Sequence, residues 1–204
     1  RHGLDLEPRL LALAASSHSG AQMHLDGVRE ILAMAGLDES ALQCALDRPL
    51  GEAERKAWGD KDAMRITMNC SGKHAAMLVT CVKNNWPIEN YLDPAHPLQV
   101  ACKSELELLA GEAVALTSTD GCGAPLFLLT MAGLARSIRA ITISTDPIHQ
   151  RVVGQKVGVT AVGEAALFHG PKILAVDPDQ VNGPCIGDTG LFFGQDDVHS
   201  LGRI

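Results

Sequence analysis

The sequence predicts a mixed α/β fold of the α+β kind, with a helical part at about 5–140 and a strand-rich part at about 141–204. Apolar residues recur at helical spacing through the first part. Short apolar runs between glycine and proline residues occupy the second part, as is typical of strands. Helices that precede strands in this way favour an α+β chain. With 204 residues, 46% of them hydrophobic, the chain can bury a substantial core.

The first two apolar segments end at recognisable stop signals. Small apolar residues at 10–15 give way to the polar segment 16–20. The second segment, 25–35, has its apolar residues on one helical face and stops at Gly36. The first is therefore a short apolar segment bounded by a turn, and the second is predicted to be a helix.

The central helices are predicted from their capping residues. Asp38 is a plausible N-cap for a short helix that reaches Leu46. Residues 47–65 are polar and are expected to form a loop. Ser71 is predicted to cap a further helix, which has apolar residues at 77–82.

Proline and glycine bound the later elements. Pro97 suits the first turn of a helix that Gly111 closes. Residues 114–118 are expected to form a strand, and Pro125 is expected to open a helix at 126–139. Four further segments are predicted to be strands between turns: 141–143, 151–159, 161–167 and 172–176.

Charge, hydropathy and cysteine spacing disfavour several kinds of partner. The formal net charge of −7 argues against nucleic acid or an anionic membrane. The sequence shows no apolar run long enough to span a bilayer. The six cysteines follow no disulfide-framework spacing, and no secretory signal precedes them. We therefore expect reduced thiols in a cytoplasmic protein, with metal binding more probable than a disulfide scaffold.

Residues 69–74, Asn-Cys-Ser-Gly-Lys-His, crowd a thiol, a hydroxyl, an amine and an imidazole together. With Ser71 at the N-cap, free amide groups and the positive end of the helix dipole lie beside these side chains. That field lowers the pKa of a nearby thiol or amine, which favours a Cys70 thiolate and a neutral Lys73. Thiolate is a ligand that zinc prefers.

Residues 120–125, Asp-Gly-Cys-Gly-Ala-Pro, place another thiol in a glycine-flanked turn. Two sulfurs with a third group around an open position are typical of a catalytic zinc site, so Cys122 is a candidate second ligand. A plainer interpretation stays open, since Cys70 and Cys122 also suit small buried positions in turns. His74 suits packing or capping equally well, and Asp120 suits a turn.

Several segments occur in the order and rough spacing of the L-asparaginase II family: 17–20 with His24, 69–74, 96–99, 120–125 and 133–136. The chain resembles the thermolabile, zinc-containing rhizobial type of this family over roughly residues 4–140. The resemblance implies a fold similar to the serine β-lactamase and glutaminase scaffold, with a sheet lobe and a helical lobe. It also implies a homodimer that hydrolyses the side-chain amide of L-asparagine to L-aspartate and ammonia.

Matched position by position, the resemblance implies that Cys70, Lys73 and Cys122 surround a zinc ion. A lysine ligand must be neutral, and both the metal and the helix dipole favour that form. Asp120 would bind the ammonium group of the substrate, because a carboxylate is its natural partner. His74 is a further expected substrate contact.

Ser17 matches the family's second catalytic serine, whose base is a lysine far along the chain. Lys156 is the best candidate for that lysine, with a solvated strand lysine as its alternative interpretation and Lys172 as a poorer candidate. The alternative interpretation of Ser17 is structural: its hydroxyl would end one helix or cap the start of the next. The family has a further Ser-x-x-Lys pair upstream, which holds its presumed nucleophile and which this sequence does not show. We therefore expect 1–204 to be one asparaginase II-like domain without its N-terminal segment, so that activity of this chain by itself stays an open question.

Three functions stay open at this point. The first is an asparaginase-type amidohydrolase, in which a hydroxyl attacks the amide beside a zinc site. The second is a direct zinc hydrolase in which Cys70 and Cys122 hold the catalytic metal. The third is a relative without activity that retains a structural metal site. The sequence does not choose between asparagine and glutamine, because one methylene is worth only about 1–3 kcal/mol in a pocket.

Overall fold

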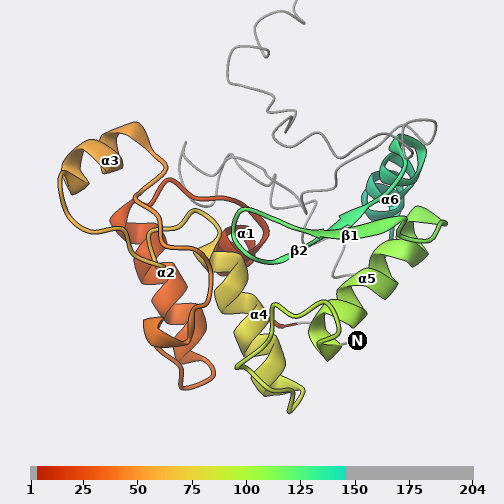
Figure 1. Cartoon of the computed structure of the whole chain (residues 1–204), viewed down its shortest axis with the longest axis horizontal. Coiled ribbons are helices and arrows are strands. Elements are labelled where there is room, and N and C mark those ends of the chain that lie inside the picture. The colour runs from red at the N-terminus through yellow and green to blue at the C-terminus, as the bar shows by residue number, and fades with distance from the viewer. Residues whose placement is uncertain (1–3, 146–204) are drawn as a thin grey trace, which may run out of the picture.

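A computed structural model describes residues 4–145 of the chain. Within that range, helices alternate with turns and a single β-hairpin follows the fifth α-helix (Figure 1). The elements are α1 (Pro8–Ala15), α2 (Gln22–Ala33), the 3₁₀ helix η1 (Glu39–Ala41), α3 (Glu52–Trp58), α4 (Ser71–Lys83), α5 (Pro97–Ala110), β1 (Leu116–Thr119), β2 (Pro125–Leu128) and α6 (Met131–Ile143). Helices combined with a small antiparallel sheet are compatible with the predicted α+β class. The similarity to the β-lactamase scaffold stays a prediction.

Helices α1, α2 and α4 pack against one another and form the main core. Val28, Ile31 and Leu32 of α2 are fully buried. Leu78 of α4 and Leu13 of α1 are buried in the same apolar cluster. Because each such side chain contributes about 1.5–3 kcal/mol when it leaves water, this layer is a firm support for the residues at its edge.

The backbone of α1 approaches α4 closely at Gly72. A Cβ atom at this position would lie 2.7 Å from the backbone oxygen of Leu13, so a side chain would force the two helices apart. The contact brings residues 16–19, which follow α1, against the start of α4. All four residues of this segment are buried.

A short hairpin lies between α5 and α6 in the sequence and reaches toward the core. Strands β1 and β2 pair antiparallel, from Leu116 opposite Leu128 to Thr119 opposite Pro125. Helices α5 and α6 pack against each other at the base of the hairpin. Figure 1 shows the hairpin loop extending away from α5 and α6, toward the side of the molecule that holds α1 and α4.

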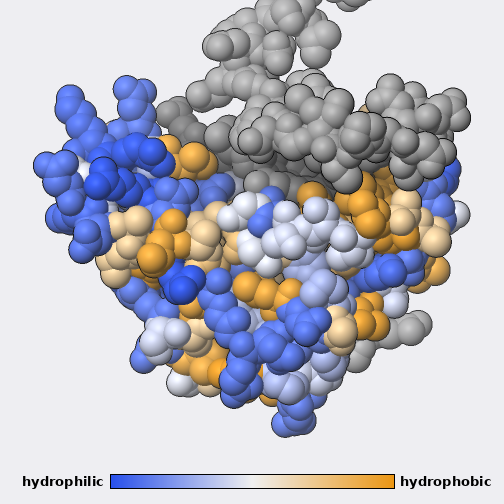
Figure 2. Space-filling model, in the orientation of Figure 1, coloured by the Kyte–Doolittle hydropathy of each residue, from blue (hydrophilic) through white to orange (hydrophobic). Residues whose placement is uncertain are grey.

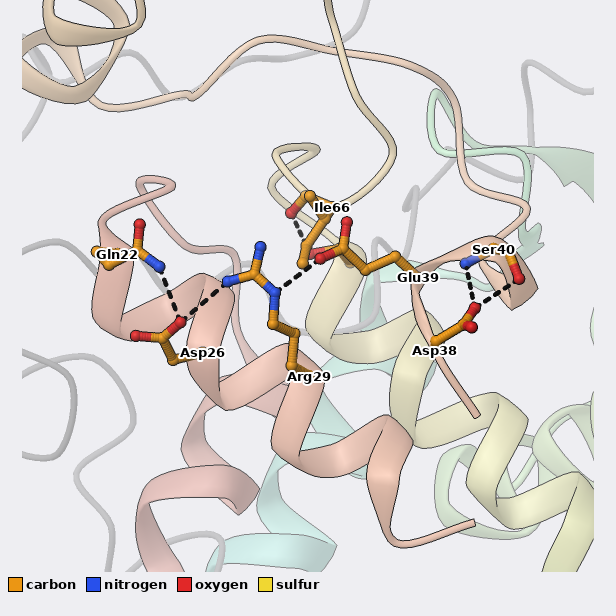
Figure 3. Close-up of polar contacts among 8 residues, drawn as sticks. Gln22, Asp26, Arg29, Asp38, Glu39, Ser40 and Ile66 are labelled. Atoms are coloured by element: carbon orange, nitrogen blue, oxygen red, sulfur yellow. Dashed lines mark hydrogen bonds and ion pairs between the residues drawn. The ribbon is translucent and has the colours of Figure 1, made fainter. Parts of the chain in front are cut away.

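Exposed polar contacts tie α2 to the segment that follows it (Figure 3). Arg29 donates hydrogen bonds to Asp26 at 2.9 Å and to Glu39 at 2.7 Å. Helix α3 contains no buried residue, and Figure 2 shows hydrophilic side chains covering it. Exposed ion pairs contribute less than about 1 kcal/mol each, so the apolar layer dominates stability in this part of the molecule.

Several predicted elements are confirmed. Helix α2 covers most of the predicted segment 25–35, and Gly36 follows it with a φ of +67°. Helix α5 begins at Pro97 and ends before Gly111, which has the left-handed conformation expected of a closing glycine. Among the described helices, none is both long and apolar enough to cross a membrane.

Other predictions are wrong. The helix expected at 126–139 begins only at Met131, because Pro125–Leu128 pairs with β1 as a strand. The strand expected at 141–143 is the last turn of α6. The helix expected after Asp38 is only the short η1, and the loop at 47–65 contains α3. The three other expected strands lie outside the described residues: 151–159, 161–167 and 172–176.

Candidate metal and catalytic site

The two cysteine motifs meet in the folded chain. Cys70 immediately precedes α4, and Cys122 lies in the loop between β1 and β2. The ligand atoms of Cys70, Asp120 and Cys122 all lie within 4.8 Å of one another. Both cysteines are buried, with 2% and 4% of their surface exposed. Two thiols and a carboxylate from distant parts of the sequence therefore form one cluster.

The hairpin loop holds Cys122 through its own hydrogen bonds. The Asp120 amide donates to the Ala124 carbonyl oxygen at 2.8 Å, and the Gly123 amide donates to the Asp120 carbonyl oxygen at 2.8 Å. Gly123 has a φ of +92°, a conformation that residues with a Cβ atom rarely adopt. The Cys122 thiol also donates to Asp120 Oδ2 at 3.2 Å. Backbone and side-chain bonds thus close the loop around the cysteine.

The start of α4 differs from the predicted cap. Cys70 is the N-cap residue, and Ser71 is the first residue of the helix. The Ser71 hydroxyl donates to the Ile66 carbonyl oxygen at 2.8 Å and lies 2.8 Å from His18 Nε2. Because the hydroxyl has only one proton, which Ile66 accepts, His18 Nε2 is the donor in the second bond. The prediction that Ser71 caps the helix is therefore wrong.

The environment of Cys122 raises its pKa well above that of a free thiol. The hydrogen bond with Cys70 is the largest cause, burial is the second, and the charge of Asp120 adds to the effect. The buried Cys122 thiol therefore stays protonated at pH 7 unless a cation joins it.

The donor set of this cluster suits zinc, the metal expected from the sequence. Zinc binds thiolate sulfur at about 2.3 Å in tetrahedral geometry, which places two sulfurs about 3.8 Å apart. The cluster, whose ligand atoms lie within 4.8 Å of one another, is compatible with that spacing. Thiolates also favour zinc over hard cations such as magnesium and calcium. A group that can hold a metal ion is thus present.

Lys73 lies in the first turn of α4 and contacts the segment after α1. Its Nζ donates to the Ser16 carbonyl oxygen at 2.9 Å. A neutral amine has a lone pair as well as two N–H groups, so Lys73 can keep this hydrogen bond while it donates the lone pair to a metal. The observed contact is therefore compatible with Lys73 as a zinc ligand, which stays a prediction.

Ser17 is fully buried in the segment between α1 and α2. Its Oγ accepts a hydrogen bond from Asn69 Nδ2 at 3.2 Å. An amide nitrogen is only a donor, so the hydroxyl proton of Ser17 is left for another acceptor. Lys156, the predicted base, lies outside the described residues. The Ser17–Lys156 pair stays a prediction.

His74 is buried below the first motif and contacts the single tyrosine of the chain. Its Nδ1 lies 2.7 Å from the hydroxyl of Tyr91, and the oxygen of that hydroxyl accepts from the Gln43 amide at 3.1 Å. Its Nε2 has no hydrogen-bond partner among the described residues. Burial, with a smaller contribution from Lys73, lowers the pKa of His74 to about 4, so the ring is neutral at pH 7. A substrate contact by His74 stays a prediction.

Comparison with known proteins supports the resemblance found in the sequence. A family model described as L-asparaginase II matches residues 1–172. The chain belongs to the L-asparaginase II family. Membership of this asparaginase family suggests a hydrolase that acts on amides, with a small molecule as its substrate. A search of curated proteins returned no match.

Three residues contact the candidate site residues although the sequence analysis gave them no role: His18, Asn69 and Tyr91. His18 and Asn69 stand inside the matched motifs, so their position was a usable signal. Their hydrogen bonds join positions 53 and 52 residues apart, which no local spacing reveals. Tyr91 stands outside the matched motifs and gives no such signal.

Proposed function

We propose that this asparaginase II chain hydrolyses the side-chain amide of L-asparagine to L-aspartate and ammonia. The observation that carries the proposal is the convergence of Cys70, Asp120 and Cys122. Asn69, the neighbour of Cys70, is hydrogen-bonded to the Ser17 hydroxyl, so the candidate nucleophile and the candidate metal ligands belong to one connected site.

In this proposal Ser17 supplies the attacking hydroxyl. Its oxygen accepts a hydrogen bond from Asn69, so its proton is free to pass to a base, for which we propose Lys156. The oxygen attacks the amide carbon, the carbon–nitrogen bond breaks, and the nitrogen leaves as ammonia after receiving a proton. Water then hydrolyses the ester that joins Ser17 to the aspartyl group and releases L-aspartate.

Cys70, Lys73 and Cys122 are proposed to hold a zinc ion. When bound, zinc supplies positive charge that favours thiolates and a neutral lysine. The chain itself places these ligands, two at the start of α4 and one in the hairpin loop. Asp120 is proposed to bind the substrate ammonium group, and His74 is proposed to contact the substrate through its unpartnered Nε2.

Ammonia release from L-asparagine tests the proposal. We expect purified full-length, zinc-loaded protein to release ammonia, and Ser17→Ala to lower kcat by about 10³-fold or more while zinc stays bound. Cys122→Ala should lose zinc. Ser40→Ala removes an exposed hydroxyl from η1 and is the matched control, which should retain full activity.

Two outcomes would contradict the proposal. If Ser17→Ala keeps its activity while Cys122→Ala is inactive, hydrolysis centred on the metal replaces the hydroxyl mechanism. If verified full-length, zinc-loaded protein releases no ammonia from L-asparagine, the chain is not an asparaginase.

A further inference from the structure

Three consecutive residues after α1 are each hydrogen-bonded to the first cysteine motif. The Ser16 carbonyl oxygen accepts from Lys73 Nζ at 2.9 Å. Ser17 Oγ accepts from Asn69 Nδ2 at 3.2 Å. The His18 amide donates to the Asn69 carbonyl oxygen at 3.0 Å. The segment that carries the proposed nucleophile is therefore bound to the motif that carries two proposed zinc ligands.

His18 adds a side-chain contact to this set. Its Nε2 donates to Ser71 Oγ at 2.8 Å, and Ser71 Oγ donates to the Ile66 carbonyl oxygen at 2.8 Å. His18 and Ser71 are both fully buried. Because the Ile66 carbonyl can only accept, the two bonds have one direction and require a His18 ring that is protonated at Nε2. His18 Nδ1 has no hydrogen-bond partner among the described residues. In a ring that is protonated at Nε2, Nδ1 carries no proton, so no N–H donor is left unpaired there.

We propose that His18 is a positioning residue, which holds the Ser17 hydroxyl in place through its own bond to Ser71. The inference rests on the proposed role of Ser17 as nucleophile. His18 is anchored twice, through its amide to Asn69 and through its ring to Ser71, and so restrains the backbone next to Ser17. Loss of the ring bond would let Ser17 shift relative to Asn69, and a displacement of about 1 Å costs about 10²-fold in rate.

A purely structural role makes a different prediction. His18 also packs against His24, with ring centroids 5.5 Å apart, so any substitution removes some packing. If packing alone mattered, a substitution would lower the Tm but leave kcat of the folded protein unchanged. A positioning role requires a fall in kcat that a side-chain N–H donor reverses.

The experiment compares His18→Leu, His18→Gln and Ser71→Ala in zinc-loaded full-length protein. We expect His18→Leu to lower kcat by about 10²-fold with KM within about twofold and zinc content unchanged. His18→Gln keeps a side-chain N–H donor and should restore most of kcat. Ser71→Ala removes the acceptor of the bond from His18, so it should lower kcat by a similar factor. The double variant with His18→Leu should have nearly the same kcat as either single variant, because both substitutions remove the same bond.

His96→Leu is the matched control. His96 is buried like His18, but its ring caps α5 at Leu98 and donates to the Pro87 carbonyl oxygen. Its loss should lower the Tm and leave kcat unchanged. Nitrogen NMR of the wild-type protein should show His18 protonated at Nε2 and unprotonated at Nδ1.

Hydrogen exchange of the amides at 16–18 tests the anchoring without any need for activity. The exchange rate of these amides should increase at least about tenfold in His18→Leu and stay unchanged in His96→Leu. Wild-type kcat in His18→Leu, or unchanged exchange in that variant, would overturn the inference and leave the asparaginase activity standing. An inactive wild-type protein would instead overturn the proposed function, and the exchange measurement would still decide whether His18 anchors the segment.

Discussion

At the scale of single residues, the site is distinguished by buried histidines that packing holds neutral. Burial is the main reason that the pKa of His18 is lowered to about 3, with smaller contributions from the charges of His24 and Lys73. The pKa of His74 is also lowered, again mainly by burial and to a smaller extent by the charge of Lys73. A neutral imidazole has one donor and one acceptor nitrogen, so both rings act at pH 7 as hydrogen-bonding groups rather than as cations.

The low pKa of His18 makes stability depend on pH. In the unfolded chain a histidine binds a proton below about pH 6.5, whereas folded His18 does so only near pH 3. The unfolded state binds more protons between these values, so the free energy of unfolding falls as the pH falls, by about 2 kcal/mol at about pH 5 for this one group. Urea unfolding of the wild-type protein and His18→Gln at pH 7 and pH 5 measures the effect.

We expect the loss of stability between pH 7 and pH 5 to be about 2 kcal/mol smaller in His18→Gln, because that variant lacks the titrating ring. Equal losses in the two proteins would show that the folded structure does not suppress protonation of His18.

At the scale of elements, the contact between α1 and α4 leaves no room for a side chain at Gly72. In Gly72→Ala the new Cβ atom would meet the Leu13 carbonyl oxygen, a backbone atom that cannot rotate away. We expect an overpacking cost of about 1–3 kcal/mol, enough to outweigh the roughly 1 kcal/mol that alanine gains in a helix. Thermal unfolding measures the loss.

Gly121→Ala is the control for this substitution. A Cβ atom at Gly121 meets nothing within 4 Å, so its effect on stability should stay within about 0.5 kcal/mol. A Tm for Gly72→Ala at or above that of Gly121→Ala would show that α1 can shift at no cost.

Helix α6 depends on the hydroxyl of Thr130 at its N-cap. The hydroxyl accepts from the Gly133 amide at 2.9 Å and donates to Glu112 Oε2 at 2.9 Å. Thr130→Ala should lower the free energy of unfolding by about 1–2 kcal/mol, whereas Thr130→Ser, which keeps the hydroxyl, should stay close to the wild type. Urea unfolding checks both variants, and similar losses in the two would mean that the methyl group, rather than the hydroxyl, stabilises this corner.

At the scale of the whole molecule, local patterns predicted elements better than they predicted how segments meet. Pro97 and Gly111 bound α5 as expected, because proline and glycine act through their own backbone conformations. Pro125 has the same local chemistry but begins a strand, since β1 supplies hydrogen-bond partners that local spacing does not reveal. The turn at 120–124 was therefore recognisable, whereas the element after it was not.

Only the convergence of the two cysteine motifs was predictable, and most of the contacts around them were not. Cys70 and Cys122 meet, as the family resemblance implies. The failure of Ser71 as a helix cap has a tertiary cause: its hydroxyl is bound to Ile66 and to His18, which is 53 residues away. Capping preferences describe a helix end in isolation, and here packing against another segment outweighs them.

The cluster of Cys70, Asp120 and Cys122 links α4 to the hairpin, so a bound metal would brace two parts of the molecule. An ion that binds only the folded chain raises the free energy of unfolding, by about 2.7 kcal/mol at one hundred times Kd. We therefore expect added zinc to raise the Tm of the wild-type protein, and a chelator to reverse the shift. Cys122→Ala should lose the shift.

Cys81→Ala separates loss of a metal ligand from loss of a buried thiol. Cys81 is fully buried on α4, outside the cluster. Its substitution should lower the Tm without zinc and preserve the upward shift when zinc is added. An equal shift in Cys122→Ala and the wild type would place the binding site elsewhere, and no shift in the wild type would show that the cluster does not bind zinc. Because the shift needs neither substrate nor turnover, it tests metal binding independently of catalysis.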